Sequence, residues 1–209
     1  MALLRATAPL ELAGRRVVLR ALEATDFDQW TEVRVRCRAW LRQWEPSLPP
    51  GHADASTDRR AFAARCGARE RERQLGTGYG FGLFVAETPT TRAFAGEINI
   101  SSIQRGPFQN AYVGYWIDEN RAGEGLVPEA LVVLLRFAFE DLGLHRVQVA
   151  IIPRNTPSRR VVQKVGLREE GVAERYLEIN GVWEDHLRHA ITAEEWAERG
   201  SDLLDAWAR

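Results

Sequence analysis

The residues with the clearest chemical potential lie in one glycine-bearing turn, Asn120-Arg121-Ala122-Gly123-Glu124-Gly125-Leu126. The stretch before it, 111–117, is rich in β-branched and aromatic residues, and Pro128 falls early in the apolar run after it. This pattern predicts a strand, a turn and a long amphipathic helix that ends near Leu142. The first N–H groups of a helix have no internal partner, and the helix dipole makes that end positive. Because glycine lets the backbone approach a ligand closely, the turn could bind a phosphate or diphosphate.

Two common phosphate-binding motifs do not match this turn. A P-loop requires Gly-Lys-Ser/Thr at the helix start, whereas the only lysine in the chain is Lys164. A dinucleotide-binding fingerprint requires a third glycine near Pro128 and an acidic residue closing the next strand, which instead ends in Ile152-Pro153-Arg154. If the turn is considered by itself, it could equally be a simple connection between a strand and a helix that binds no phosphate.

Three further polar residues occupy positions where chemistry is possible. Asn155 and Ser158 open a predicted short helix that ends at Gly166, and helix capping is the structural alternative for both. Glu97 lies midway along an apolar stretch, 93–103. Strand alternation could simply point Glu97 to solvent, or its carboxylate could act as a general base. The sequence leaves both interpretations of Glu97 open.

The elements that must position these residues follow from hydrophobic periodicity and turn signals. A run of antiparallel strands followed by a strand–helix–strand unit predicts an α/β fold, with a central mixed, mostly antiparallel sheet flanked by helices. We expect one domain over 1–209 with its core at about 12–196. The predicted strands are 15–22, 81–87, 93–103, 111–117 and 145–152, the helices 26–44, 57–75, 126–142, 156–165 and 193–208, the breaks 46–51 and 88–92, and the final hairpin 168–179 and 181–191 across Asn180-Gly181.

Composition narrows the class of protein. The 209 residues, 45% hydrophobic and 27% charged, are ordinary for a soluble globular domain. A net charge of -1 gives no support for direct nucleic-acid binding. The chain has no apolar run long enough to span a membrane and no signal-peptide core, so we expect a cytoplasmic protein. Cys37 and Cys66 have neither metal-ligand nor redox spacing, so we predict no metal site.

These motifs together resemble the Gcn5-related N-acetyltransferases (GNAT), and in particular the branch of ribosomal-protein N-terminal alanine acetyltransferases. In that family a Gln/Arg-x-x-Gly-x-Gly/Ala loop covers the pyrophosphate of CoA, and the matching residues here are Asn120, Gly123 and Gly125. Asn120 departs from the usual first residue. The resemblance extends over roughly 12–196 and implies a GNAT-like fold in which the parallel strands 111–117 and 145–152 splay apart at the cofactor site.

The resemblance also implies the cofactor, acetyl-CoA, and the residues that bind it. Backbone groups freed by the splay would hydrogen-bond the pantetheine, and the matching positions are Trp116, Ile117 and Asp118. Many family members use a tyrosine as the acid for the leaving thiolate, but the matching residue here is Val162, so we assign that role to Ser158. The predicted cofactor-binding residues are Trp116, Ile117, Asp118, Arg121, Ala122, Gly123, Glu124, Gly125, Leu126, Asn155 and Ser158, and the predicted catalytic residues are Ser158 and Glu97.

The acceptor site implied by the family lies near Trp40, Trp44, Glu45, Tyr176 and Asp185, for which core packing and cross-strand pairing are the alternatives. The predicted function is acetyl transfer to a primary amine by direct attack in a ternary complex, because no activated nucleophile is evident. The expected acceptor is the N-terminal alanine or serine of a protein such as a ribosomal protein. A small-molecule amine, such as an antibiotic or polyamine, and a non-catalytic acyl-CoA-binding module are the alternatives. We expect a monomer or homodimer.

Overall fold

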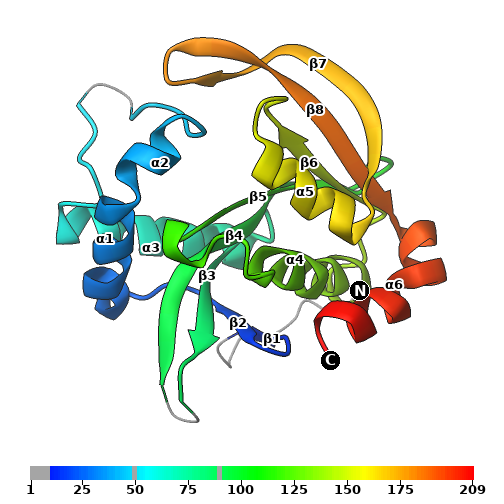
Figure 1. The fold of residues 1–209 in the computed structure, drawn as a ribbon, viewed down its shortest axis with the longest axis horizontal. Coiled ribbons are helices and arrows are strands. Elements are labelled where there is room, and N and C mark those ends of the chain that lie inside the picture. The colour runs from blue at the N-terminus through cyan, green and yellow to red at the C-terminus, as the bar shows by residue number, and fades with distance from the viewer. Residues whose placement is uncertain (1–9, 49–50, 89–90) are drawn as a thin grey trace.

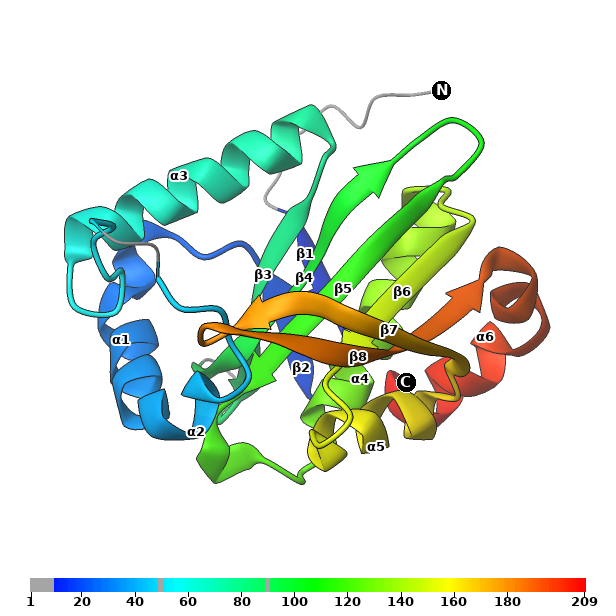
Figure 2. The same cartoon turned by 90° about the horizontal axis from the view of Figure 1, so that it is seen from above.

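The computed structural model describes residues 10–48, 51–88 and 91–209, which contain one eight-stranded sheet in the order β1-β2-β3-β4-β5-β6-β8-β7 (Figures 1 and 2). Only β5 and β6 are parallel, and every other neighbouring pair is antiparallel. The predicted mixed, mostly antiparallel sheet is therefore confirmed. The strands are β1 (Glu11–Ala13), β2 (Val17–Arg20), β3 (Tyr79–Ala86), β4 (Arg92–Gln104), β5 (Asn110–Ile117), β6 (Arg146–Ile151), β7 (Arg168–Ile179) and β8 (Val182–Thr192).

Helices cover both faces of this sheet, as the two views show (Figures 1 and 2). On one face, α1 and α3 pack on β4 and β3, and Phe62 and Phe84 are part of the apolar cluster between them. On the other face, α4 packs against β2, β4 and β5, and Leu83 and Leu131 belong to the larger core there. The helices are α1 (Phe27–Arg36), α2 (Arg38–Arg42), α3 (Arg59–Leu75), α4 (Leu126–Arg136), α5 (Thr156–Val165) and α6 (Ala193–Trp207). No helix in this described part of the chain has the length and apolar composition that crossing a membrane requires.

Several element boundaries differ from the sequence-based expectations. The helix predicted over 26–44 is interrupted at Cys37, and β1 was not predicted. The helix predicted to reach Leu142 ends at Arg136, and a π-helical turn follows it. That helix is not amphipathic, because every residue from Leu126 to Leu135 is buried between the sheet, α5 and α6. Residues 49–50 and 89–90, within the two predicted breaks, lie outside the described residues.

The β7–β8 hairpin extends past the rest of the sheet toward α2 (Figure 1). Asn180 and Gly181 both have positive φ, 51° and 85°, which is the conformation that a two-residue Asn-Gly turn favours. The Ser47 hydroxyl, just beyond α2, donates a hydrogen bond to Asn180 Oδ1 at 3.1 Å. The tip of the hairpin and the segment after α2 are therefore neighbours, although 133 positions separate them in the sequence.

Glu129 attaches the first turn of α4 to β2. Its carboxylate is fully buried and accepts hydrogen bonds from the backbone N–H groups of Arg16 and Val17, at 2.5 and 2.9 Å. It also pairs with the Arg16 guanidinium, Nε to Oε2, at 2.9 Å. A buried charge is tolerated only when it is fully hydrogen-bonded, and Glu129 meets that condition with three donors.

We expect Glu129→Gln to lower the free energy of unfolding by about 2 kcal/mol, because the amide NH₂ would face donors and leave buried N–H groups unpaired. Chemical denaturation measures this difference. Glu198→Gln is the matched control, since Glu198 is exposed and loses the same charge. Equal stability of the two variants would contradict the structural role of Glu129.

Candidate active site

The turn between β5 and α4 presents backbone N–H groups that have no acceptor. Gly123 and Gly125 adopt positive φ values of 91° and 82°, which side chains with a Cβ rarely adopt. The N–H groups of Ala122 and Glu124 donate within the turn, whereas those of Gly123 and Gly125 donate to no oxygen in the described part of the chain. Gly125 also caps α4, and the first N–H groups of any α-helix have no acceptor within the helix. The turn therefore concentrates free donors at the positive end of a helix.

Arg16 adds a guanidinium to this turn beside its pair with Glu129, and sequence reasoning did not find it. Its guanidinium donates to the carbonyl oxygen of Glu124 at 3.0 Å, and its side chain remains 39% exposed. A Cβ added to Gly125 would lie 3.4 Å from Arg16 Nη2. Arg121, by contrast, pairs with Glu87 at 3.2 Å. Free N–H groups beside an exposed guanidinium form a site suited to a diphosphate.

The parallel strands β5 and β6 separate soon after they pair. The ladder joins 110–112 to 146–148 and then stops, so 113–117 and the end of β6 have no pairing between them. On its other edge, β5 is bound to β4: Gly114 N–H donates to Asn99 Oδ1 at 3.2 Å, and Asp118 N–H donates to the Ala95 oxygen at 2.6 Å. The predicted splay is present in the structure.

The direction of each amide along β5 follows from these bonds. Successive N–H groups of a strand point to opposite edges. Because the amides of Gly114 and Asp118 face β4, those of Tyr115 and Ile117 face the gap. Among the three predicted pantetheine contacts, Ile117 alone directs its backbone into the gap, and the amides of Trp116 and Asp118 are directed toward β4. We therefore replace Trp116 and Asp118 with Tyr115 in the predicted backbone contact.

A pair of hydroxyl groups lies where the gap meets α5. Tyr115 Oη lies 3.0 Å from Ser158 Oγ and 3.2 Å from the Ser158 carbonyl oxygen, so its single proton can be donated to one or the other. Asn155 caps α5 by accepting a hydrogen bond from Ser158 N–H at 3.2 Å. Burial raises the pKa of the Tyr115 hydroxyl, so this side chain is a neutral donor at physiological pH. Val162, at the position of the family tyrosine, is fully buried.

The sequence matches a known family of enzymes over most of its length. Residues 16–168, well over half of the chain, match the acetyltransferase (GNAT) domain. The chain belongs to the GNAT acetyltransferase family. Among its relatives, the [ribosomal protein uS5]-alanine N-acetyltransferase of Escherichia coli is 31% identical over 187 residues, which cover 90% of this chain and 93% of the relative. The probable N-acetyltransferase YjcK of Bacillus subtilis is also 31% identical, over 86% of this chain and 96% of its own length.

Solved GNAT structures agree with the fold. Mycobacterium smegmatis RimJ, solved in complex with CoA-disulfide, superposes with a TM-score of 0.82 at 32% identity, over 95% of this chain and 93% of that one. The ribosomal-protein-S5-alanine acetyltransferase of Vibrio fischeri gives 0.78 at 27% identity, over 90% and 98%. The predicted GNAT fold, its ribosomal-protein alanine acetyltransferase branch and the predicted enzyme class, an acetyl-CoA-dependent N-acetyltransferase, are confirmed.

Glu97 of this GNAT domain does not point into solvent, so that alternative is wrong. Its side chain is 13% exposed beneath α1 and α3. One carboxylate oxygen accepts from Trp30 Nε1 at 2.7 Å, and the other pairs with Arg65 at 2.5 Å. Each carboxylate oxygen can accept a second hydrogen bond, so an incoming ammonium would approach Glu97 beside these two donors. The role of Glu97 as base stays a prediction.

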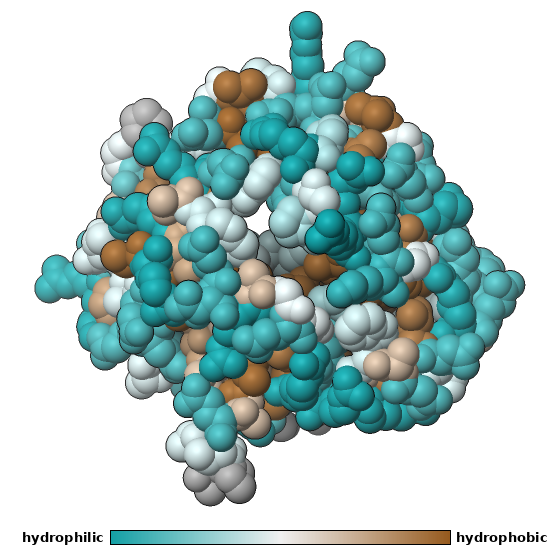
Figure 3. Space-filling view, viewed as in Figure 1, coloured by the Kyte–Doolittle hydropathy of each residue, from teal (hydrophilic) through white to brown (hydrophobic). Residues whose placement is uncertain are grey.

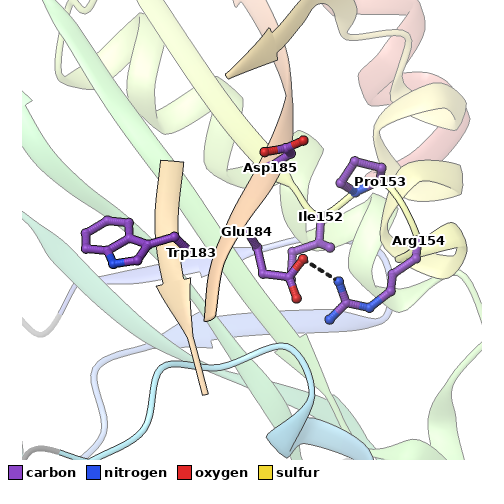
Figure 4. Close-up of a pocket in the computed structure, with 6 residues that line it drawn as sticks. All are labelled: Ile152, Pro153, Arg154, Trp183, Glu184 and Asp185. Atoms are coloured by element: carbon purple, nitrogen blue, oxygen red, sulfur yellow. Dashed lines mark ion pairs between the residues drawn. The ribbon is translucent and has the colours of Figure 1, made fainter. Parts of the chain in front are cut away.

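One of the predicted acceptor residues lines a cavity of about 300 Å³ beside the end of β6, and a second contacts a residue of its wall (Figure 4). Asp185 lines this cavity, and the Arg154 guanidinium there lies 5.4 Å from the ring centre of Trp44. Figure 4 shows Glu184 and Arg154 pointing toward one another, and they form an ion pair at 2.7 Å. Arg154 thus joins the segment after α2 to β8. The lining residues are Ile152, Pro153, Arg154, Trp183, Glu184 and Asp185.

The other predicted acceptor residues have structural partners. Trp40 packs against both apolar clusters, which agrees with its alternative as a core residue. Glu45 forms a two-pronged pair with Arg34, at 2.7 and 2.8 Å. Tyr176 packs edge-on against the imidazole of His186, with ring centres 5.6 Å apart. None of these contacts tests a role in acceptor binding, which stays a prediction for all three.

Proposed function

We propose that this chain transfers the acetyl group of acetyl-CoA to the N-terminal alanine or serine of a protein such as a ribosomal protein. The proposal rests on three features that lie next to one another along 115–126 and the start of α5. They are the free N–H groups near Gly125, the unpaired edge of β5 and the Tyr115–Ser158 pair. The name of the E. coli relative supports the choice of acceptor. Action in the cytoplasm belongs to the same proposal.

The residues present fit the proposed cofactor. The N–H groups of Gly123 and Gly125, with Arg16, would hold the diphosphate. The open backbone edge at Tyr115 and Ile117 would hydrogen-bond the pantetheine amides as an added strand does. Acetyl-CoA supplies the acetyl group as a thioester, whose carbonyl carbon is the electrophile.

Direct attack by the amine is favoured because neither cysteine suits an acyl-enzyme. Cys37 is fully buried and its thiol donates a hydrogen bond to Asp118 Oδ1, and burial raises the pKa of that thiol. Burial likewise raises the pKa of the half-buried Cys66. Thiolate is the nucleophilic form, and these environments disfavour it. The reaction we propose therefore holds both substrates together, and much of its rate comes from positioning.

Ser158 and Tyr115 would act on the leaving sulfur. When Tyr115 donates its proton to Ser158 Oγ instead of to the Ser158 carbonyl oxygen, the Ser158 proton is free to point away from Tyr115. In the proposed complex that hydroxyl would donate a hydrogen bond to the departing sulfur, and the proton lost by the attacking amine would balance the charge of the thiolate. The acyl oxygen would be stabilised by a backbone N–H at the open edge of β5.

A protein acceptor is favoured by the open surface on the other side of the gap. Figure 3 shows the surface hollowed between the β7–β8 hairpin and the side of the molecule that carries α1 and α2. Exposed apolar side chains follow the hairpin, including Trp183 at 60% and Val182 at 58% exposure. An extended peptide needs such an open, partly apolar channel, whereas small ligands are mostly enclosed.

CoA release measured with a panel of acceptors tests the proposal. Peptides that begin with alanine or serine should be acetylated at the terminal amine, and the same peptides with a blocked terminus should not be. A preference for polyamines or aminoglycosides would contradict the protein acceptor. Tight CoA binding without turnover on any amine would favour a non-catalytic binding module.

Glu97→Gln tests the proposed base. We expect the rate near neutral pH to fall about tenfold, and to approach the wild-type rate at high pH, where the acceptor amine is already neutral. The pH dependence of kcat/KM measures this. Glu72→Gln, which removes a half-exposed carboxylate on α3, should leave the profile unchanged. A profile of Glu97→Gln that is identical to wild type would exclude Glu97 as the base.

A further inference from the structure

Arg188 of β8 carries a positive charge that no carboxylate balances. Its side chain is half-buried, and no acidic group of residues 10–48, 51–88 or 91–209 lies within ion-pair distance of it. Neighbouring arginines differ: Arg146 pairs with Glu170, and Arg154 pairs with Glu184. A half-buried cation without a counter-charge can bind an anion without first breaking an ion pair.

Neutral groups fix the direction of this guanidinium. Arg188 donates to Gln148 Oε1, and Gln148 Nε2 donates to Asn110 Oδ1 at 2.6 Å. Gln148 and Asn110 are only 1% and 0% exposed, and Asn110 Nδ2 has no partner among the described atoms. The guanidinium also lies 5.6 Å from the ring centre of Tyr176. Burying two amides to hold one cation favours a binding role over a packing role, because an apolar pair would cost less.

The register of the sheet places Arg188 on the acceptor side. Val147 and Val149 of β6 belong to the core beneath α4, so Gln148 and Ala150 face the opposite side. Arg188 is the partner of Ala150 in the β6–β8 ladder and shares that face. The β5–β6 ladder ends at Gln148, so Arg188 lies one strand away from the start of the gap.

The hairpin folds over this same face. Burial and the neighbouring Tyr112 hydroxyl of β5 raise the pKa of Tyr176 of β7, so these two side chains lie close together although β6 and β8 lie between their strands in the sheet. The hairpin therefore curls across the face on which Arg188 lies, as its arch in Figure 2 also indicates. An acceptor that enters between the hairpin and the α2 segment would pass this guanidinium.

We propose that Arg188 binds a carboxylate of the acceptor, supplied by an acidic side chain close behind the reacting amine; this rests on the proposed protein acceptor. Guanidinium and carboxylate are geometrically matched and form paired, charge-assisted hydrogen bonds. A neutral acceptor would leave the charge of Arg188 unbalanced in the ternary complex. The acceptors preferred by this enzyme are thus chains that begin with a small residue followed within a few positions by aspartate or glutamate.

A peptide series tests this inference. One alanine-initiated neutral peptide is compared with versions that carry a single glutamate, or a single lysine, at position 2, 3 or 4. For the wild-type enzyme we expect kcat/KM to rise about tenfold or more for one glutamate position, mostly through a lower KM, and to fall for lysine at that position. Arg188→Gln should abolish the preference, and Arg188→Glu should favour the lysine peptide.

The controls separate this inference from the function on which it rests. Arg60→Gln removes an equal charge from an exposed position on α3 and should keep the wild-type preference. Arg188→Lys keeps the charge and should retain part of it. Equal kcat/KM for all wild-type peptides, or a preference that survives in Arg188→Gln, would overturn the role of Arg188 while acetylation of the neutral peptide still supports the function. The wild-type series decides the question even if an Arg188 variant fails to fold.

Discussion

Gly125→Asp is expected to weaken CoA binding about 100-fold while leaving the fold intact. Gly125 has a φ of 82°, a conformation that aspartate tolerates better than most residues, and it occupies the cap position of α4. The new carboxylate would stand where the diphosphate is proposed to bind. Two charges about 5 Å apart at an effective dielectric of about 20 repel by about 3 kcal/mol. The carboxylate would also reach Arg16, whose Nη2 would lie 3.4 Å from the new Cβ, and would compete for that cation.

Gly125→Asn is the matched control, because asparagine has the same shape and left-handed tolerance without the charge. Calorimetric titration with CoA should give a loss of about tenfold or less for asparagine, and about 100-fold for aspartate. Similar affinities for wild type and the aspartate variant, in a protein with an unchanged melting temperature, would remove the turn from the binding site. Equal losses for both variants would instead assign the effect to bulk.

Local patterns in the sequence predicted most of the sheet because strand alternation and turn residues are short-range properties. Asn180-Gly181 is an example: two residues with positive φ determine a hairpin without help from distant parts of the chain. The long-range pairing of β5 with β6 was predicted too, but from the family resemblance, since nothing local distinguishes the partner of a parallel strand.

The contacts that sequence reasoning missed all depend on distant residues. Arg16 reaches Glu124 across 108 positions, and the buried carboxylate of Glu129 is what holds Arg16 there. Periodicity could place Arg16 on one side of a strand but could not identify the turn it contacts. The full burial of α4 was missed for the same reason, because its outer side is covered by α5 and α6. Leu126 to Leu135 contains only one charged residue, Glu129, and that was the available signal.

Tyr115 places a second hydroxyl beside α5 that the motif comparison did not find. The family tyrosine falls on Val162 of α5, where the sequence offers no proton donor. The structure brings a different tyrosine to α5 from β5, with its hydroxyl 3.0 Å from Ser158 Oγ. The signal was the alternation of β5, in which Val113, Tyr115 and Ile117 share the face that carries α4 and α5.

Ser158→Ala is expected to lower kcat about 100-fold with little change in the affinity for CoA. The reason is that the hydroxyl would act only as the carbon–sulfur bond breaks, whereas the bound cofactor is held elsewhere, at the turn and the edge of β5. Stopped-flow or steady-state measurement of CoA release gives kcat, and calorimetry gives the affinity for CoA. A rate within a factor of about two of wild type would remove Ser158 from the mechanism.

Tyr115→Phe turns this test into a measurement of coupling. If Tyr115 acts through Ser158, the phenylalanine variant should lose about tenfold in kcat in the wild-type background and almost nothing once Ser158 is alanine. Additive losses would show instead that Tyr115 acts independently, for example by shaping the gap. Tyr79→Phe, which removes a hydroxyl on β3, is the control and should not change kcat. Comparing the Tyr115→Phe loss with and without Ser158→Ala separates two causes. A packing defect at Tyr115 would lower kcat whether residue 158 is serine or alanine, whereas the hydrogen bond to Ser158 Oγ can be lost only when Ser158 is present.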